Sequence, residues 1–249
     1  MSKIINTLIV PLVLFAFTAC HQEKESNKAA IGNNVSDKPA ALVEEVLSKE
    51  QQEALSPDDV IKLLKEGNTR FVNSDLTARD HSKQVRKSTL AQYPKAIVLS
   101  CVDSRVPVED VFDRGIGDLF VARVAGNFVN EDILGSMEFA CKVSGSKLIL
   151  VMGHEHCGAV KAAVDDVKLG NITAMLQKIR PAVENVTYVG ERNAKNQEFV
   201  HMVCESNIRN AIAQIRLNSP ILKDMEDKGE IKIVGGVYDM DNGKVAWLD

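Results

Sequence analysis

Short apolar runs alternate with helical patterns over most of this 249-residue chain, and no other sequence feature constrains its fold as strongly. The runs are dominated by Ile, Leu, Val and Ala, and they span residues 96–99, 119–122, 148–151 and 231–234. Runs this short and apolar are typical of strands that are buried on both faces. Strands that alternate with helices pair in parallel and are covered by those helices. We therefore predict an α/β fold with a mostly parallel central β-sheet covered by helices on both faces.

Helical spacing of apolar residues separates the predicted strands. The main patterns cover residues 133–143, 159–167 and 206–217. Upstream, Ser56 followed by Pro57 predicts a helix start, because serine caps free N–H groups and proline suits the first turn. Gly67 is the weak point of that helix. Residues 42–47 indicate a further amphipathic helix, and we find no internal repeat and no second folded domain.

Cysteine and histidine residues follow two of the predicted strands. Residues 101–105 read Cys-Val-Asp-Ser-Arg after the first strand, and residues 153–158 read Gly-His-Glu-His-Cys-Gly after the third. Functional sites of parallel sheets gather at the carboxyl ends of the strands. We therefore expect these two segments to form one site.

Two thiols and an imidazole supply three of the four ligands that tetrahedral zinc requires. We predict Cys101, His154 and Cys157 as the ligands. A helical turn would place His154 and Cys157 on the same side, whereas His156 would diverge by about 100° and is the poorer candidate. Three protein ligands leave one position open, which is typical of catalytic zinc. A structural or storage zinc site is the alternative for these three residues taken alone.

Asp103 and Arg105 are close enough in sequence to form a charge-assisted pair. A carboxylate that Arg105 keeps ionised would accept the proton of a zinc-bound water and so orient the hydroxide. Taken singly, Asp103 would also fit a helix cap, and Arg105 a solvated surface charge.

The N-terminus has the layout of an export signal. Lys3 precedes an apolar stretch, residues 4–19, that is short for a membrane-spanning helix of roughly 20 residues. The stretch ends Phe-Thr-Ala before Cys20, which resembles the lipobox of bacterial lipoproteins. An ordinary cleaved signal, with Cys20 incidental, is the alternative.

We accordingly predict a signal peptide over residues 1–19, a lipid-anchored flexible tether over residues 20–38, and the folded domain over residues 39–249. The anchor at Cys20 would hold an exported protein on the periplasmic side of a membrane. His21 after the anchor cysteine favours the outer membrane, by analogy with other lipoproteins.

The composition excludes one class of partner. The net charge is −4, and basic residues are interspersed with acidic ones, so no basic face for nucleic acid is expected. Cys141 and Cys204 lie in apolar helical patterns and are interpreted as core residues, with a disulfide between them left open. His201 has no ligand spacing with its neighbours and is interpreted as an ordinary histidine.

The chain resembles the β-class carbonic anhydrase family. The resemblance rests on C-x-D-S-R at residues 101–105 and G-H-x-x-C-G at residues 153–158, and it covers roughly residues 55–249. Further matching segments are residues 67–71, 92–94, 112–113, 117–121, 123–127, 136–138 and 238–239.

The resemblance implies one Zn2+ per chain, held by Cys101, His154 and Cys157, and the reversible hydration of carbon dioxide to bicarbonate and a proton by attack of zinc-bound hydroxide. It implies Asp103 and Arg105 as the orienting pair. In some members the aspartate at the position of Asp103 becomes the fourth zinc ligand, in a closed and inactive form only, and whether Asp103 does so stays open at this point. Some of those members also bind bicarbonate at a second site that includes a Trp where this chain has Val98, so that regulation is not expected here.

The resemblance also assigns substrate-binding roles to Gln92 and Phe120. It implies a homodimer in which N-terminal helices pack on the partner, or a dimer of such dimers. Two other functions stay open at this point. One is hydrolysis of a sulfur analogue such as carbonyl sulfide, and the other is zinc binding by a non-catalytic lipoprotein.

Overall fold

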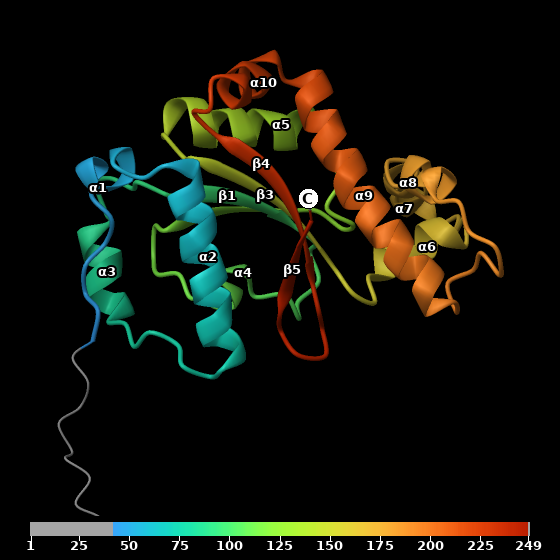
Figure 1. Cartoon of the computed structure of the whole chain (residues 1–249), viewed down its shortest axis with the longest axis horizontal. Coiled ribbons are helices and arrows are strands. Elements are labelled where there is room, and N and C mark those ends of the chain that lie inside the picture. The colour runs from blue at the N-terminus through green and yellow to red at the C-terminus, as the bar shows by residue number, and fades with distance from the viewer. Residues whose placement is uncertain (1–41, 249) are drawn as a thin grey trace, which may run out of the picture. The chain divides into compact units, whose positions relative to one another are not determined.

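A five-stranded sheet organises residues 42–248, the part of the chain that the computed structural model describes (Figure 1). The strands are β1 (Ala96–Ser100), β2 (Leu119–Arg123), β3 (Leu148–His154), β4 (Lys232–Tyr238) and β5 (Val245–Leu248). Their order is β2-β1-β3-β4-β5, with the first four parallel and β5 antiparallel to β4. The predicted α/β fold with a mostly parallel sheet is confirmed.

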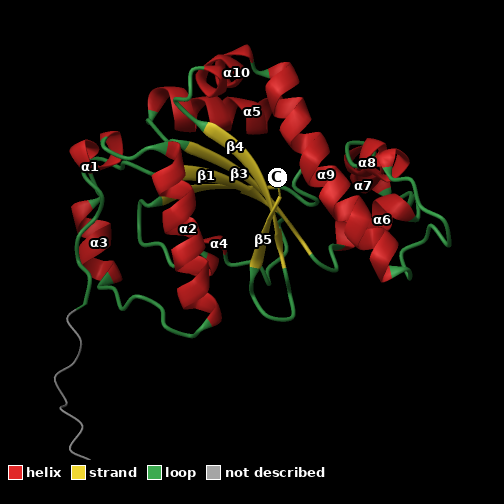
Figure 2. Ribbon diagram, in the orientation of Figure 1, coloured by secondary structure: helices red, strands yellow, loops and turns green. Residues whose placement is uncertain are grey.

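Helices cover both faces of this sheet (Figure 2). The helices are α1 (Lys49–Glu53), α2 (Pro57–Val72), α3 (His81–Lys87), α4 (Val108–Val111), α5 (Glu131–Glu138), the π-helix η1 (Phe139–Val143), α6 (Gly158–Val164), α7 (Gly170–Leu176), α8 (Arg180–Asn185), α9 (Gln197–Asn218) and α10 (Pro220–Asp227). Helices α6, α7 and α8 gather beside α9 (Figure 1).

Alternate residues of each strand enter different cores, as the two-residue repeat of a strand requires. Ile97 and Leu99 of β1 pack with α5, α9 and α10 on one face. Ala96 and Val98 pack with α2 and α4 on the other face. β1 is buried along its whole length, which explains why its sequence is a continuous apolar run instead of an alternating one.

Two expectations about the first helices are wrong. Residues 42–47 form no helix: the Val43 N–H donates to Ala78 O at 2.8 Å and its carbonyl accepts from Asp80 N at 3.0 Å. This backbone pairing with a distant segment replaces the local hydrogen bonds of a helix. Gly67 is not a weak point of α2, because a Cβ there would lie 1.9 Å from the carbonyl oxygen of Phe112. The glycine lets α2 pack directly against the end of α4.

β5 was not predicted, and β4 is longer than the apolar run that predicted it. Gly235 and Gly236 lie inside β4, although a pair of glycines is by itself a common turn signal. A Cβ on Gly235 would lie 2.8 Å from Ile208 of α9, so the glycine allows the close approach of that helix. Packing against α9 thus overrides the local turn signal.

The strand order creates a switch point between β1 and β3. The chain leaves β1 toward β2 on one side and later returns to place β3 on the other side. Ligand sites of such sheets lie at the carboxyl ends of the two strands that flank this point. Cys101 follows β1, and His154 is the last residue of β3.

The predicted signal peptide, the predicted lipid anchor at Cys20 and the predicted tether lie outside the described residues. Within residues 42–248, no helix has the length and apolar character needed to cross a membrane. The packing of N-terminal helices on a dimer partner stays a prediction.

Candidate metal centre

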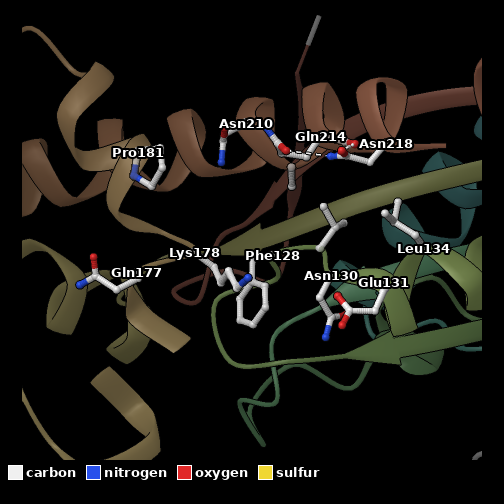
Figure 3. Close-up of a pocket in the computed structure, with 12 residues that line it drawn as sticks. Phe128, Asn130, Glu131, Leu134, Gln177, Lys178, Pro181, Asn210, Gln214 and Asn218 are labelled. Atoms are coloured by element: carbon white, nitrogen blue, oxygen red, sulfur yellow. Dashed lines mark hydrogen bonds between the residues drawn. The ribbon is translucent and has the colours of Figure 1, made fainter. Parts of the chain in front are cut away.

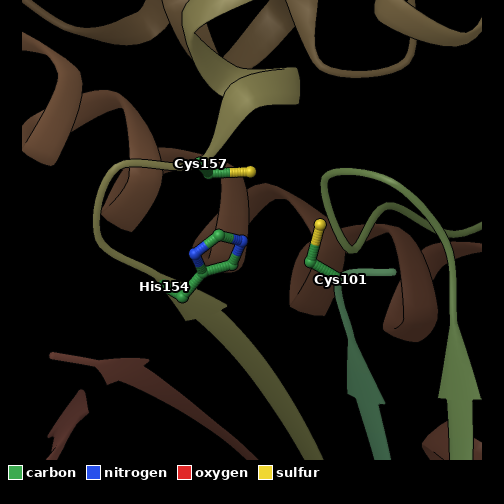
Figure 4. A group of neighbouring side chains, drawn as sticks. All are labelled: Cys101, His154 and Cys157. Atoms are coloured by element: carbon green, nitrogen blue, oxygen red, sulfur yellow. The ribbon is translucent and has the colours of Figure 1, made fainter. Parts of the chain in front are cut away.

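Three potential metal ligands converge at the switch point (Figure 4). Cys101 follows β1, His154 ends β3, and Cys157 is the residue before α6. Their donor atoms all lie within 4.8 Å of one another. The exposed fractions of Cys101, His154 and Cys157 are 4%, 1% and 1%, so the cluster is withdrawn from bulk water.

The histidine is oriented to bind a metal. His154 Nδ1 donates to the backbone carbonyl of Glu155 at 2.8 Å, and Nε2 is buried without a hydrogen-bond partner among the described residues. Because a carbonyl only accepts, the proton lies on Nδ1 and the lone pair on Nε2. An unpartnered buried nitrogen is costly unless something binds it. Together with two thiols, this donor set fits tetrahedral zinc.

The two thiols shift each other's pKa in opposite directions. A hydrogen bond from Cys157 lowers the pKa of Cys101 well below its ordinary value and raises the pKa of Cys157. The Gly126 N–H also donates to Cys101 Sγ at 3.4 Å and so favours the thiolate. Zinc binding displaces thiol protons, and the low pKa of Cys101 means that one of the two is already easily lost.

The segment between His154 and Cys157 is a turn and not the helical turn that their spacing predicted. His156, inside it, has a left-handed backbone with φ of 57°. This turn still brings His154 and Cys157 to the same side, as their spacing predicted. His156 is not in the converging set of ligands.

Asp103 and Arg105 form a bidentate ion pair beside the cluster. Arg105 Nε and its terminal nitrogen donate to the two carboxylate oxygens of Asp103 at 2.9 and 2.8 Å, and the Arg105 backbone N–H donates at 3.0 Å. These hydrogen bonds, led by those of the guanidinium, hold the pKa of Asp103 well below its usual range. Asp103 Oδ2 lies 3.9 Å from His154 Nε2, so an ionised oxygen borders the metal position.

Gln92 and Phe120 lie apart from this cluster. Gln92 is exposed in the segment that precedes β1, whereas Cys101 follows the opposite end of that strand. Phe120 pairs with Ile97, four residues before Cys101 and so roughly 13 Å away along the strand. The Phe120 ring contacts Phe139 at 6.1 Å between centroids. Within the chain, neither residue lines the metal centre.

The remaining sequence expectations concern cysteines and histidines. Cys141 and Cys204 are buried free thiols, and burial raises the pKa of each to about 12. His201 is bonded to Glu155, the residue that follows His154. Sequence reasoning missed this contact because His201 and Glu155 are 46 residues apart. It also assigned no role to Gly126. The φ of this residue is 81°, in the left-handed region that favours glycine.

A separate hollow of about 530 Å³ lies between α5, α8 and α9 (Figure 3). Its walls carry the amide side chains of Asn130, Gln177, Asn210, Gln214 and Asn218. None of the three candidate ligands lines it. The metal centre is therefore a different site.

Comparisons with known proteins identify the family. A family model described as carbonic anhydrase matches residues 96–245, which include all three candidate ligands. Carbonic anhydrase 2 of Mycobacterium tuberculosis is 33% identical over 194 residues, or 76% of this chain and 91% of that protein. The chain belongs to the carbonic anhydrase family. A carbonic anhydrase of Mycolicibacterium smegmatis is 34% identical over 74% of this chain and 89% of that protein.

Solved structures show that the fold is that of the β-class. A Coccomyxa β-carbonic anhydrase matches with a TM-score of 0.60 and 24% identity, covering 76% of this chain and 84% of that one. A tetrameric β-carbonic anhydrase of Sordaria macrospora matches with a TM-score of 0.58 and 22% identity, covering 66% and 84%. The fold and a Cys-His-Cys cluster suited to one zinc ion therefore agree with the family.

Removing one sulfur ligand should abolish zinc binding. We expect Cys101→Ala to lower the zinc content, measured by atomic emission on purified protein, from about one ion per chain to close to none. Cys141→Ala is the matched control, because it removes a buried thiol away from the cluster and should leave zinc in place. Equal zinc content in the two variants would contradict the assignment.

Proposed function

We propose that this protein is a zinc carbonic anhydrase that catalyses the reversible hydration of carbon dioxide to bicarbonate and a proton. Membership of the family and the names of its relatives support the activity. The observation that carries the proposal is the combination of three converging ligands with an ionised carboxylate at their border. Asp103 Oδ2 lies 3.9 Å from His154 Nε2, yet both of its oxygens are held by Arg105.

The metal ligands, Asp103 and Arg105 have different roles in the proposed reaction. Cys101, His154 and Cys157 would hold the metal, and zinc when bound supplies a Lewis acid that lowers the pKa of water to about 7. Asp103 accepts a hydrogen bond from the attacking water and thereby aims its lone pair at carbon dioxide. Arg105 keeps Asp103 ionised and fixes its orientation. The proton released by hydration leaves to solvent.

The role of Asp103 can be separated from zinc binding. Asp103→Ala should retain zinc, because Cys101, His154 and Cys157 are untouched, but lose about 100-fold or more in the rate of carbon dioxide hydration. Stopped-flow hydration at pH 7 and pH 8.5 measures this loss. Glu109→Gln, an exposed carboxylate on nearby α4, is the control and should keep the wild-type rate.

Two results would oppose the proposal. Hydration by Asp103→Ala at the wild-type rate would remove Asp103 from the mechanism. Zinc-loaded wild-type protein that hydrates no carbon dioxide at either pH would contradict the activity, and carbonyl sulfide would then be the next substrate to assay.

We further propose a homodimer, alone or as a dimer of dimers, in which Gln92 and Phe120 serve the partner's metal centre. Their distance from the metal centre of their own chain supports this assignment. The outer edge of β2 has no strand partner among the described residues. Beside it, a hollow of about 700 Å³ is lined by Phe120, Phe139 and their neighbours. An unpaired edge with apolar surface favours association, and a second copy would cover it.

Mixing two inactive variants tests the shared site. His154→Ala lacks a metal ligand but keeps Gln92, whereas Gln92→Ala keeps the metal centre. If Gln92 acts across the interface, unfolding and refolding the two variants together should restore part of the hydration rate, because mixed dimers contain one complete site. A mixture no more active than the sum of its components would show that Gln92 does not act in the partner's site.

We also propose that Cys20 carries a lipid and anchors the exported protein on the periplasmic side, in the outer membrane. The apolar stretch and the Phe-Thr-Ala-Cys ending support this proposal.

Fractionation of cells tests the anchor. Wild-type protein should sediment with membranes, and Cys20→Ser should move it to the soluble fraction or leave it with an uncleaved signal. Cys141→Ala should sediment with membranes like the wild type. Wild-type protein found wholly in the soluble fraction would rule out the lipid.

A further inference from the structure

The turn that joins two metal ligands is tied to α9 by one side chain. Glu155 directly follows His154, and its carboxylate oxygen Oε1 accepts a hydrogen bond from His201 Nδ1 at 2.6 Å. His201 lies in the first half of α9, on a different element from any candidate ligand. This contact lies outside the catalytic pair and the ligand set described above.

Glu155 is held at three points. Its N–H donates to Tyr238 O of β4 at 3.0 Å, its carbonyl accepts from His154 Nδ1 at 2.8 Å, and its carboxylate accepts from His201. The carbonyl is the group that fixes the tautomer and the ring orientation of His154. A partner that orients the Glu155 peptide therefore also orients the lone pair of His154 Nε2.

The turn needs a restraint on Glu155 because the residue that follows, His156, has a strained backbone. His156 adopts a left-handed backbone, φ 57°, which residues with a side chain rarely populate. A strained conformation persists when its surroundings hold it. The His201 contact supplies one such restraint immediately before the strained residue.

α9 packs closely against the strand that carries His154. The helix has 22 residues and packs closely on the end of β3. A Cβ on Gly153 would lie 2.9 Å from Cys204 Sγ and 2.8 Å from Ile208 Cδ1, both on α9. This close packing places the first half of α9, and with it His201, beside the turn that follows His154.

The contact between His201 and Glu155 has a competing explanation, which is an ion pair that affects only the stability of the fold. The side chains of His201 and Glu155 are 44% and 25% exposed, and exposed ion pairs contribute little to global stability. Glu205 also lies near His201, with Oε1 3.5 Å from Nε2, and its other oxygen faces Arg209. A surface pair of this kind would leave metal binding unchanged when it is removed.

We propose that His201 is a positioning residue of the metal centre, which acts through Glu155 on the orientation of His154. The inference rests on the proposed zinc site. It predicts that loss of His201 weakens zinc binding while the stability of the metal-free protein stays the same.

The experiment measures zinc release from purified full-length protein to excess dipicolinate at one pH. His201→Ala should release zinc about 10 to 100 times faster than wild type, the range found when partners of metal ligands are removed. His201→Asn should restore the wild-type rate to within about threefold, because its amide can donate from nearly the same place as Nδ1. Gln197→Ala is the matched control, an exposed side chain one turn before His201 on α9, and it should release zinc as wild type does.

A double variant tests the path through Glu155. Glu155→Ala and His201→Ala should each accelerate release, and the two together should be no faster than the faster single variant. The unfolding midpoint of the metal-free protein should change no more in His201→Ala than in Gln197→Ala.

Three outcomes would overturn the positioning role. They are wild-type zinc release by His201→Ala, additive effects in the double variant, and faster release matched by an equal loss of stability in the metal-free protein. Zinc content separates this failure from that of the proposed function. A wild-type chain that binds no zinc overturns the metal centre itself, whereas equal retention by wild type and His201→Ala overturns only the role of His201.

Discussion

The parallel pairing of β1 with β3 is the interaction on which the site depends. Leu99 pairs with Val151, so the two strands reach the same edge of the sheet within a few residues of each other. Cys101 and His154 are 53 positions apart in sequence, and no local structure could bring them together. The apolar residues of both strands, buried in two cores, stabilise the pairing and thereby fix the distance between the first two ligands.

Contacts around the ligands orient the side chains that the strand pairing brings close together. Gly126 donates to Cys101, and its own carbonyl accepts from Asn207 of α9 at 2.7 Å. His201, six residues earlier on the same helix, forms a hydrogen bond with Glu155, the residue after His154. One long helix thus contacts the supports of two ligands that come from different strands. The orientation of the ligands therefore depends on how α9 packs, and a change in that packing would alter the geometry of the metal centre.

The sequence predicted what depends on local pattern and residue type. The strands from residues 96, 119 and 148 were found because buried parallel strands are continuous apolar runs, and the ligands because two thiols and an imidazole followed them. It failed where distant contacts decide: residues 42–47 pair with residues 78–80, and Gly67 serves the packing of α2 on Phe112. Gln92 and Phe120 were assigned by resemblance, which gives a residue its role without saying in which chain it acts.

The left-handed turn at His156 has a consequence for how the ligand motif should be read. Its backbone conformation is open to glycine and asparagine and closed to β-branched residues, whatever the metal requires. The position just before Cys157 is thus restricted by main-chain sterics, although its side chain is not among the ligands. A chain with valine or isoleucine there could carry every ligand of the motif and still place its last sulfur wrongly. The two x positions of G-H-x-x-C-G therefore differ in this chain: Glu155 is restrained through its side chain by His201, and His156 is restrained through its left-handed backbone.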